Sequence, residues 1–420
     1  MGKISVQVII SSWVVAVSVL LNRIVPQPYM DEIFHIPQAQ QYCKGNFRSW
    51  DPMITTPPGL YIVSLAYVAS LFPGLFAVKV DVSFSDACSP SILRSTNGVL
   101  AVFCSILVYD ILTHLRPSLS DRKVALRTVV LALYPLHWFF TFLYYTDIAS
   151  LTAVLASYLM SLKKKYFFSS LVGALAVLIR QTNIIWILFI ACTGVLDYIL
   201  NQQEDSADLT DSSQSQGKDA FPVSSQGVGT HSNLRKRRIH NQAATFSSPF
   251  HQTVASPVPS SDFSHEVREN SSILWQFKWE LIASFLPYLI IMTTFITFVY
   301  WNGSIVLVIK YHWSMKYLLV PLYVYSWISI FNTLAKSQRK TWVLVYFLAT
   351  AVTLIPAPLI EFRYYTIPFF FLILHSHVDD VRSWLLMGIL YVAINNFTMY
   401  VLLFRPFSWV HETGVQRFIW

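Results

Sequence analysis

The chain has 420 residues, of which 54% are hydrophobic and only 12% are charged. A soluble domain of this size carries roughly twice that share of charged residues, so the composition excludes an ordinary soluble protein. Several apolar runs reach the roughly 17–25 residues that span a bilayer, which predicts an all-α, multi-pass membrane protein. The net charge of +8 does not indicate nucleic-acid binding, because the basic residues lie mostly between hydrophobic runs, where they set membrane orientation.

The N-terminal part of the chain begins with an apolar run at residues 4–21. No small-x-small cleavage site follows this run, so we expect a retained helix rather than a signal peptide. Residues 22–58 are polar and rich in proline, which breaks long helices into short pieces. The apolar run 59–78 either spans the membrane or lies embedded on the lumenal side. We adopt the second interpretation, because it leaves the basic loop 116–127 in the cytoplasm, as the positive-inside rule prefers.

The later apolar runs then cross the membrane alternately and give about eleven spans in total. This predicts an N-terminal bundle, residues 1–200, which contains the lumenal acidic loop 22–58, and a C-terminal bundle, residues 273–420. Residues 201–272 are rich in Ser, Gln and Asp and are predicted to form a disordered cytoplasmic loop. The expected later spans are 92–115, 126–145, 148–162, 166–179, 184–200, 281–300, 317–334, 342–360, 364–374 and 385–404.

The four cysteines are widely spaced and form no C-x-x-C pair, so zinc and redox motifs are not indicated. Cys104 and Cys192 lie inside apolar runs and are expected to be core residues. Cys43 and Cys88 could share one compartment, which leaves a disulfide between them open.

Four polar clusters fall at helix ends on the predicted lumenal side. Together they offer carboxylates for proton abstraction and arginines, whose planar fork matches phosphate oxygens. This combination suits transfer from a phosphate-linked donor. The clusters are Asp31-Glu32-x-x-His35, Tyr145-Thr146-Asp147, Arg180-Gln181-Thr182-Asn183 and Glu361-Phe362-Arg363-Tyr364.

The N-terminal candidates each have a structural alternative. Asp31 and Glu32 are candidates for a catalytic base, but helix capping or membrane orientation would also explain them. His35 either binds phosphate, orients the base or is a structural interfacial histidine. Asp51 is a candidate substrate contact, although an Asp-Pro turn is the commoner explanation.

The remaining candidates are substrate-binding residues. Asp147 either contacts substrate or caps the following helix. Arg180, with Gln181 beside it, either contacts phosphate or extends its charge toward the membrane interface. Glu361 and Arg363 either take part in binding or pair with each other. We expect no metal ion and no cofactor, because too few metal ligands are visible and the cytoplasmic loops lack nucleotide-binding motifs.

Several sequence blocks, in order along nearly the whole chain, carry a family resemblance. DEIFHIPQAQ joined to WDPMITTPPGLY is highly specific, and YYTD, RQTNIIW, NGSIVL, KYLLVP, LIEFRYY and QRFIW follow. The chain resembles the dolichyl-phosphate-glucose α-1,2-glucosyltransferase family. The resemblance implies a GT-C type bundle of the endoplasmic reticulum membrane with a lumenal acidic first loop. It also implies inverting glucose transfer from dolichyl-phosphate glucose to a diglucosylated dolichyl-pyrophosphate oligosaccharide for protein N-glycosylation, with Asp31 or Glu32 as base.

The chain departs from this family at one place. Family members carry further spans and a lumenal polar block between NGSIVL and KYLLVP, whereas Leu307 is followed here almost directly by Lys316. We therefore expect an internal deletion near residues 307–316, which keeps the later helices correctly oriented but makes the chain weakly active or inactive. The alternative functions are a membrane transporter or channel-associated subunit, for which internal repeats and midplane charges are typical, and an inactive truncated variant.

Overall fold

The computed structural model of the chain is helical, as the sequence predicts. The chain separates into two compact units, residues 1–197 with 277–420, and residues 198–276. Across the described residues, the only β-structure is one isolated bridge between Phe407 and Gln416. The described residues are 2–78, 84, 87–215, 278–302, 327–354, 361–407 and 416–417.

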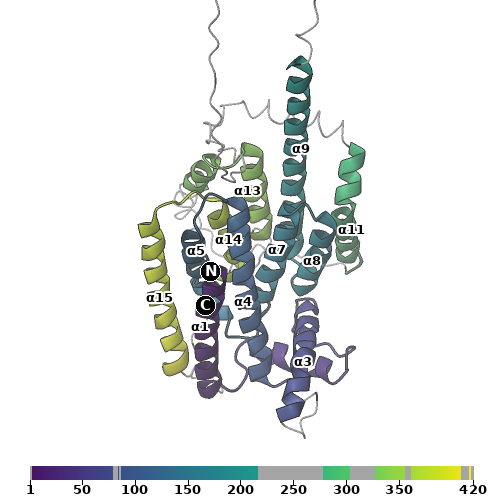
Figure 1. Ribbon diagram of the computed structural model, residues 1–420. Helices are drawn as coiled ribbons and strands as arrows, with labels where there is room; N and C mark the ends of the chain where they lie inside the picture. Colours follow the sequence, from purple (N-terminus) through teal and green to yellow (C-terminus); the bar gives the residue numbers. More distant parts are fainter. Residues whose placement is uncertain are drawn as a thin grey trace, which may run out of the picture. The chain divides into compact units, whose positions relative to one another are not determined.

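Figure 1 shows the helices with their labels, coloured by position along the chain. Residues 327–335 are helical as well. The bounds are α1 (Gly2–Ile24), α2 (Glu32–Cys43), α3 (Gly59–Val78), α4 (Pro90–Leu115), α5 (Asp121–Ala132), α6 (Pro135–Phe140), α7 (Thr146–Leu162), α8 (Tyr166–Ile179), α9 (Asn183–Ser215), α11 (Lys278–Asn302), α13 (Lys340–Leu354), the 3-10 helix η1 (Phe362–Tyr365), α14 (Thr366–His375) and α15 (Val381–Phe404).

The helix bounds depart from the expected spans at specific points. Residues 126–145 do not form the single helix that was expected, because α5 ends before Pro135 and the short α6 begins at it. Proline lacks an N–H and its ring clashes with the preceding turn, so it starts a helix more readily than it continues one. Helix α9 extends through Ser215, into the segment predicted to be a disordered loop. The rest of that loop, to residue 272, and the predicted deletion near 307–316 lie outside the described residues.

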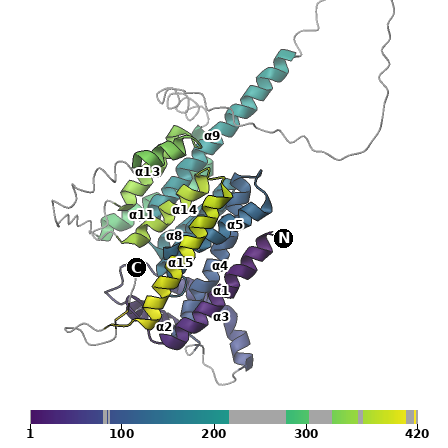
Figure 2. The ribbon, with the colours of Figure 1, turned by 90° about the vertical axis from the view of Figure 1, so that its left-hand side faces the viewer.

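Helices α1, α4 and α5 pack together, and α4 also packs against α7, which pairs with α8. Figure 2 shows α1 beside α4. The buried side chains of α1 include Val6, Ile10 and Val14, which recur every four residues and form one stripe. Val8 and Val15, on the rest of the helix surface, are exposed although they are apolar. Helix α1 is therefore apolar on both its packed and its unpacked faces.

An aromatic core lies where α1, α4, α6 and α15 meet. Phe139 and Phe140 at the end of α6 are each 1% exposed. They form one cluster with Leu21 of α1 and with Leu402 of α15. The cluster continues into Phe142, Leu143 and Tyr145, in the loop that connects α6 to α7. Because close-packed interiors tolerate little displacement, this core fixes the position of that loop.

Three of the described helices, α1, α4 and α15, are long and apolar enough to cross a membrane. Six further apolar helices or helix segments are shorter, at 10–17 residues. Helix α15 exposes large apolar side chains such as Leu386, Ile389 and Phe397, each 67% exposed. Contiguous apolar surface of this kind is typical of a membrane protein. The expected total of about eleven spans remains a prediction.

A disulfide joins Cys43, at the end of α2, to Cys88, just before α4, with a Cα–Cα distance of 6.6 Å. The sequence left this pairing open. The bond brings together the two ends of the segment that contains α3. Cys104 is free and buried, and Cys192 is free and partly buried.

We expect thiol labelling to detect this disulfide. The denatured, unreduced protein should take up two polymer-maleimide tags, at Cys104 and Cys192, and the reduced protein should take up four. The measurement is the stepwise mobility shift on a denaturing gel. The variant Cys43→Ser should gain one tag without reduction, because Cys88 loses its partner. Four tags on the unreduced protein would contradict the disulfide.

Candidate active site

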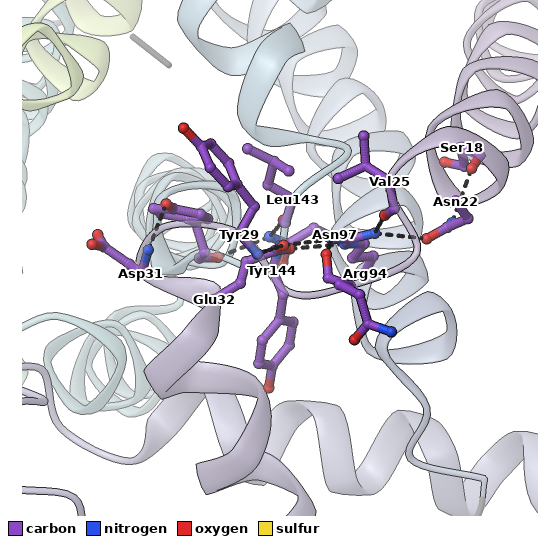
Figure 3. A network of polar contacts seen from close by, with 12 residues as sticks. Ser18, Asn22, Val25, Tyr29, Asp31, Glu32, Arg94, Asn97, Leu143 and Tyr144 are labelled. Carbon is purple, nitrogen blue, oxygen red and sulfur yellow. Dashed lines mark hydrogen bonds and ion pairs between the residues drawn. The ribbon is translucent and has the colours of Figure 1, made fainter. Parts of the chain in front are cut away.

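Asp31 and Glu32 are sequence neighbours in different environments. The Glu32 side chain is 0% exposed and receives two hydrogen bonds from Arg94, Nε to Oε1 at 2.9 Å and Nη2 to Oε2 at 2.6 Å. The Asp31 side chain is 45% exposed and points away from this pair (Figure 3). A buried, fully paired carboxylate is poorly available for proton abstraction. The geometry therefore favours Asp31 over Glu32 as the candidate base.

The backbone just before Asp31, at the start of α2, has an unusual conformation. Asp31 holds the N-cap position, but its side chain caps no backbone N–H, so capping does not explain the residue. Met30 has a φ of 54°, in the left-handed region that residues with side chains rarely adopt. Such strain persists only where the surroundings over-determine the backbone. Nearby, the Tyr29 hydroxyl donates to the carbonyl of Arg417 and accepts from its N–H, at 2.7 Å for the second bond.

A cavity of about 340 Å³ brings together residues that are far apart in the sequence. Its walls come from the first turn of α2, residues 53–56, the loop before α7, residues 180–182 and residues 363–364. The predicted site residues that line it are Asp31, His35, Arg180, Gln181 and Arg363.

Two arginines share the carboxylate of Asp147 beside this cavity. Arg180 Nη1 lies 2.8 Å from Asp147 Oδ1, and Arg363 Nη1 lies 3.9 Å from Asp147 Oδ2. Arg363 also lies 3.4 Å from Asp31 Oδ2 and forms an ion pair with Glu361. Burial acts to lower the pKa of Arg363, but these carboxylates outweigh burial and raise it, so the guanidinium stays charged. The result is a pair of cations held in place beside the candidate base.

The positions of Asp147 and Arg180 exclude their simplest structural explanations. Asp147 lies in the first turn of α7, and the N-cap of that helix is Tyr145. Arg180 is held by Asp147 and by the ring of Tyr364, whose centroid lies 5.2 Å from the guanidinium carbon. A side chain that is fixed on two sides and 12% exposed does not extend into the membrane interface.

His35 and Gln181 form polar parts of the cavity wall. His35 Nδ1 shares a hydrogen bond of 2.6 Å with the Tyr61 hydroxyl. Burial lowers the pKa of His35, although Asp31 opposes this, so the neutral imidazole is favoured at neutral pH. Gln181 donates to the carbonyl of Thr55 at 3.0 Å. Within the described ranges, no three His, Cys, Asp or Glu side chains are grouped closely enough to hold a metal ion.

Four of the predicted residues lie outside the cavity lining, and one of them, Asp147, lies beside it against the two arginines. Glu32 is buried against Arg94, and Glu361 forms an ion pair with Arg363. Asp51 forms a local turn, because its Oδ1 accepts a hydrogen bond from the N–H of Met53 at 2.9 Å. The turn explanation therefore fits Asp51 better than substrate contact does.

Arg94 is a polar residue of the site that is absent from the predicted set. It falls within the expected span 92–115. An arginine near the end of an otherwise apolar helix is costly to bury and usually marks a site or a partner. That signal was present in the sequence, although the identity of the partner was not.

Comparisons with known proteins agree with the predicted family. The DIE2/ALG10 family model matches residues 25–308 and 307–374. A relative from Arabidopsis thaliana is 46% identical, with all of both chains covered. A human relative is 30% identical over 95% of this chain and 94% of its own. Both are named Dol-P-Glc:Glc(2)Man(9)GlcNAc(2)-PP-Dol alpha-1,2-glucosyltransferase. No solved structure matches.

The family match is interrupted where the sequence analysis expects the deletion. Its two segments meet at residues 307–308. The alignment with the Arabidopsis relative runs over 514 residues, more than the 420 of this chain, so it opens gaps opposite this chain. Since the family model nevertheless covers most of the sequence and this relative aligns with all of it, the chain belongs to the DIE2/ALG10 family.

Proposed function

We propose that this chain transfers glucose from dolichyl-phosphate glucose to the diglucosylated lipid-linked oligosaccharide and forms the terminal α-1,2-linked glucose. The names of the relatives support this substrate pair. The observation that carries the proposal is the 340 Å³ cavity, where the exposed carboxylate of Asp31 lies beside the guanidinium groups of Arg180 and Arg363. One carboxylate and two arginines supply a base and a phosphate-binding pair at one place.

The proposed reaction is a single inverting displacement. The acceptor hydroxyl attacks the anomeric carbon of glucose as the bond to phosphate breaks, and dolichyl phosphate leaves. Asp31 takes the proton of the attacking hydroxyl, a contribution of typically 10²–10⁴-fold. Arg180 and Arg363 stabilise the charge that develops on the leaving phosphate. A phosphate that draws Arg363 toward itself also frees the Asp31 carboxylate, which Arg363 contacts at 3.4 Å.

The other predicted residues have supporting roles in this proposal. Asp147 and Glu361 hold the two partly buried arginines in place, where an unpaired charge would be costly. His35 and Gln181 contact the substrate from the cavity wall. Asp51 shapes the loop that carries the cavity residues 53–56.

We further propose that the protein is a GT-C type, multi-pass enzyme of the endoplasmic reticulum membrane, with its acidic first loop in the lumen. The Cys43–Cys88 disulfide supports the lumenal position, because disulfides persist in oxidising compartments. The exposed apolar faces of α1 and α15 support contact with the lipid bilayer.

The same disulfide supports a lumenal embedded position for α3 rather than a crossing. Helix α3 has 20 residues, and Cys88 follows its last residue, Val78, by only a short link. If α3 crossed the bilayer, the nine residues between Val78 and Cys88 would have to cross back, although a helix that crosses a bilayer needs about 20 residues. Non-helical backbone in contact with lipid leaves its polar groups unsatisfied and is not tolerated.

Replacement of the candidate base should separate chemistry from folding. Asp31→Asn should lower glucose transfer by roughly 10²–10⁴-fold, the typical contribution of a general base, and should leave the amount of folded protein unchanged, because the side chain is exposed and only its charge is lost. The measurement is transfer of glucose to the diglucosylated acceptor in microsomes, in a version that carries the family's missing block. Near-normal rates in both Asp31→Asn and Glu32→Gln would rule out a base at this pair.

Arg180→Ala should weaken use of the donor more than use of the acceptor. A hydrogen bond to a charged group contributes about 1.5–3 kcal/mol, so we expect a loss of roughly tenfold or more in donor use. The measurement is the dependence of the transfer rate on donor and acceptor concentration, in the version that carries the family's missing block. Arg180→Lys, which keeps the charge but not the fork, serves as the control and should lose less. Unchanged donor dependence with a lower protein yield would assign the residue a structural role.

The present chain should restore glucosylation poorly compared with a version in which the missing block is inserted between residues 307 and 316. The interrupted family match is the reason, since helices that lack their neighbours expose polar faces to lipid. Both versions are expressed in cells that lack the endogenous enzyme, and addition of the third glucose is measured at equal protein levels. Equal restoration by the two versions would show that the block is dispensable.

A further inference from the structure

Arg94, in the first turns of α4, is the most completely bonded arginine around the site. It is 2% exposed, and all of its N–H groups have acceptors. Nε and one Nη2 hydrogen donate to Glu32, and the other Nη2 hydrogen donates to the carbonyl of Gln27 at 3.0 Å. Nη1 donates to Asn22 Oδ1 at 3.1 Å and to the carbonyl of Val25 at 2.6 Å. One side chain therefore ties α4 to the end of α1 and the start of α2.

Glu32 extends the same network in two further directions. Its Oε1 accepts a hydrogen bond from the N–H of Tyr144 at 2.6 Å, and its Oε2 accepts one from the N–H of Tyr29 at 3.2 Å. The first bond reaches the loop before α7, and the second closes the turn that contains Met30. Figure 3 shows these contacts converging on the Arg94–Glu32 pair. The hydrogen bond between the N–H of Tyr29 and the side chain of Glu32 therefore spans Met30 and stabilises its left-handed conformation.

The network ends at the candidate base. The N–H of Asp31 donates to the Tyr145 hydroxyl at 3.1 Å. The carbonyl of Tyr145 is in turn held by Asn97, which lies one turn after Arg94 on α4 and also binds the carbonyl of Leu143. The first turns of α4 therefore fix both the backbone that carries Asp31 and the loop opposite it.

We propose that Arg94 is a positioning residue: through Glu32, Tyr29 and the loop before α7, it sets where the Asp31 carboxylate lies in the cavity. This deepens the proposed function and rests on it, because it takes Asp31 as the base. A misplacement of about 1 Å in a catalytic group can cost about a hundredfold in rate. Lysine at position 94 would keep the positive charge but could not make the two-pronged contact with Glu32.

The first test follows position directly and needs no activity. Asp31→Cys is labelled in membranes with a membrane-impermeant maleimide, against a background without the added cysteine. Addition of Arg94→Lys should change the labelling rate several-fold. Arg127→Lys is the matched control, because Arg127 is also 2% exposed and ion-paired, with Asp379, but lies in α5 away from the cavity. An unchanged labelling rate in folded Arg94→Lys would overturn the proposal.

The second test asks whether the effect on rate passes through the base. In the version that carries the family's missing block, Arg94→Lys should lower turnover at saturating substrates by about a hundredfold, with little change in KM. In an Asp31→Asn background, it should cost almost nothing further, since the base that it positions is absent. If Arg94→Lys lowered the rate by the same factor in both backgrounds, Arg94 would not act by positioning Asp31. No effect of Asp31→Asn would instead overturn the base assignment and leave the labelling result to decide the position.

Asn22→Ala guards against a failure of Arg94→Lys to fold. It removes a single acceptor of Arg94 and leaves the ion pair intact. Its labelling rate should shift in the same direction as that of Arg94→Lys, and less. If Asn22→Ala folds and labels like the parent while Arg94→Lys does not fold, Arg94 serves folding alone and the proposal fails.

Discussion

The buried ion pair between Arg94 and Glu32 is the contact on which the rest of the site depends. Removing two charges from water is costly, and the cost is offset only where geometry is good and the remaining polar atoms find partners. Both conditions hold here, since the guanidinium is fully bonded and the carboxylate accepts two backbone N–H groups besides. Loss of one partner from such a pair typically costs about 3–5 kcal/mol. The pair therefore constrains three stretches of backbone at once.

The cavity next to this pair differs electrostatically, because several charged side chains share their partners there. Asp31, Asp147 and Glu361 surround the guanidinium of Arg363, and Asp147 is shared with Arg180. These charges compensate one another, so neither guanidinium group is left without an anionic partner. A phosphate that enters would exchange one anion for another around the same guanidinium groups. Binding would then require rearrangement of ion pairs rather than burial of a new charge.

The sequence predicts the helical class, most helix positions and the set of polar clusters, because apolar periodicity and charges at helix ends are local properties. Five of the nine predicted site residues line one cavity, which supports the assumption that the clusters face one compartment. The different environments of Asp31 and Glu32 could not be predicted, because they depend on Arg94, 62 positions away from Glu32. The break between α5 and α6 was missed for a simpler reason. Pro135 lies within an apolar run, and hydrophobicity alone does not register it.

The spread of these contacts along the chain has a consequence for synthesis. Asp31 meets Arg363 across 332 positions, and Tyr29 meets Arg417 across 388. A ribosome has therefore produced nearly all of this chain before these two partners of the first loop exist. Until then the acidic loop can acquire its disulfide and its contact with α4, but not the arginine that lies against Asp31. An incompletely synthesised protein would consequently lie in the membrane without an assembled site. The site could assemble only after the late helices have been translated.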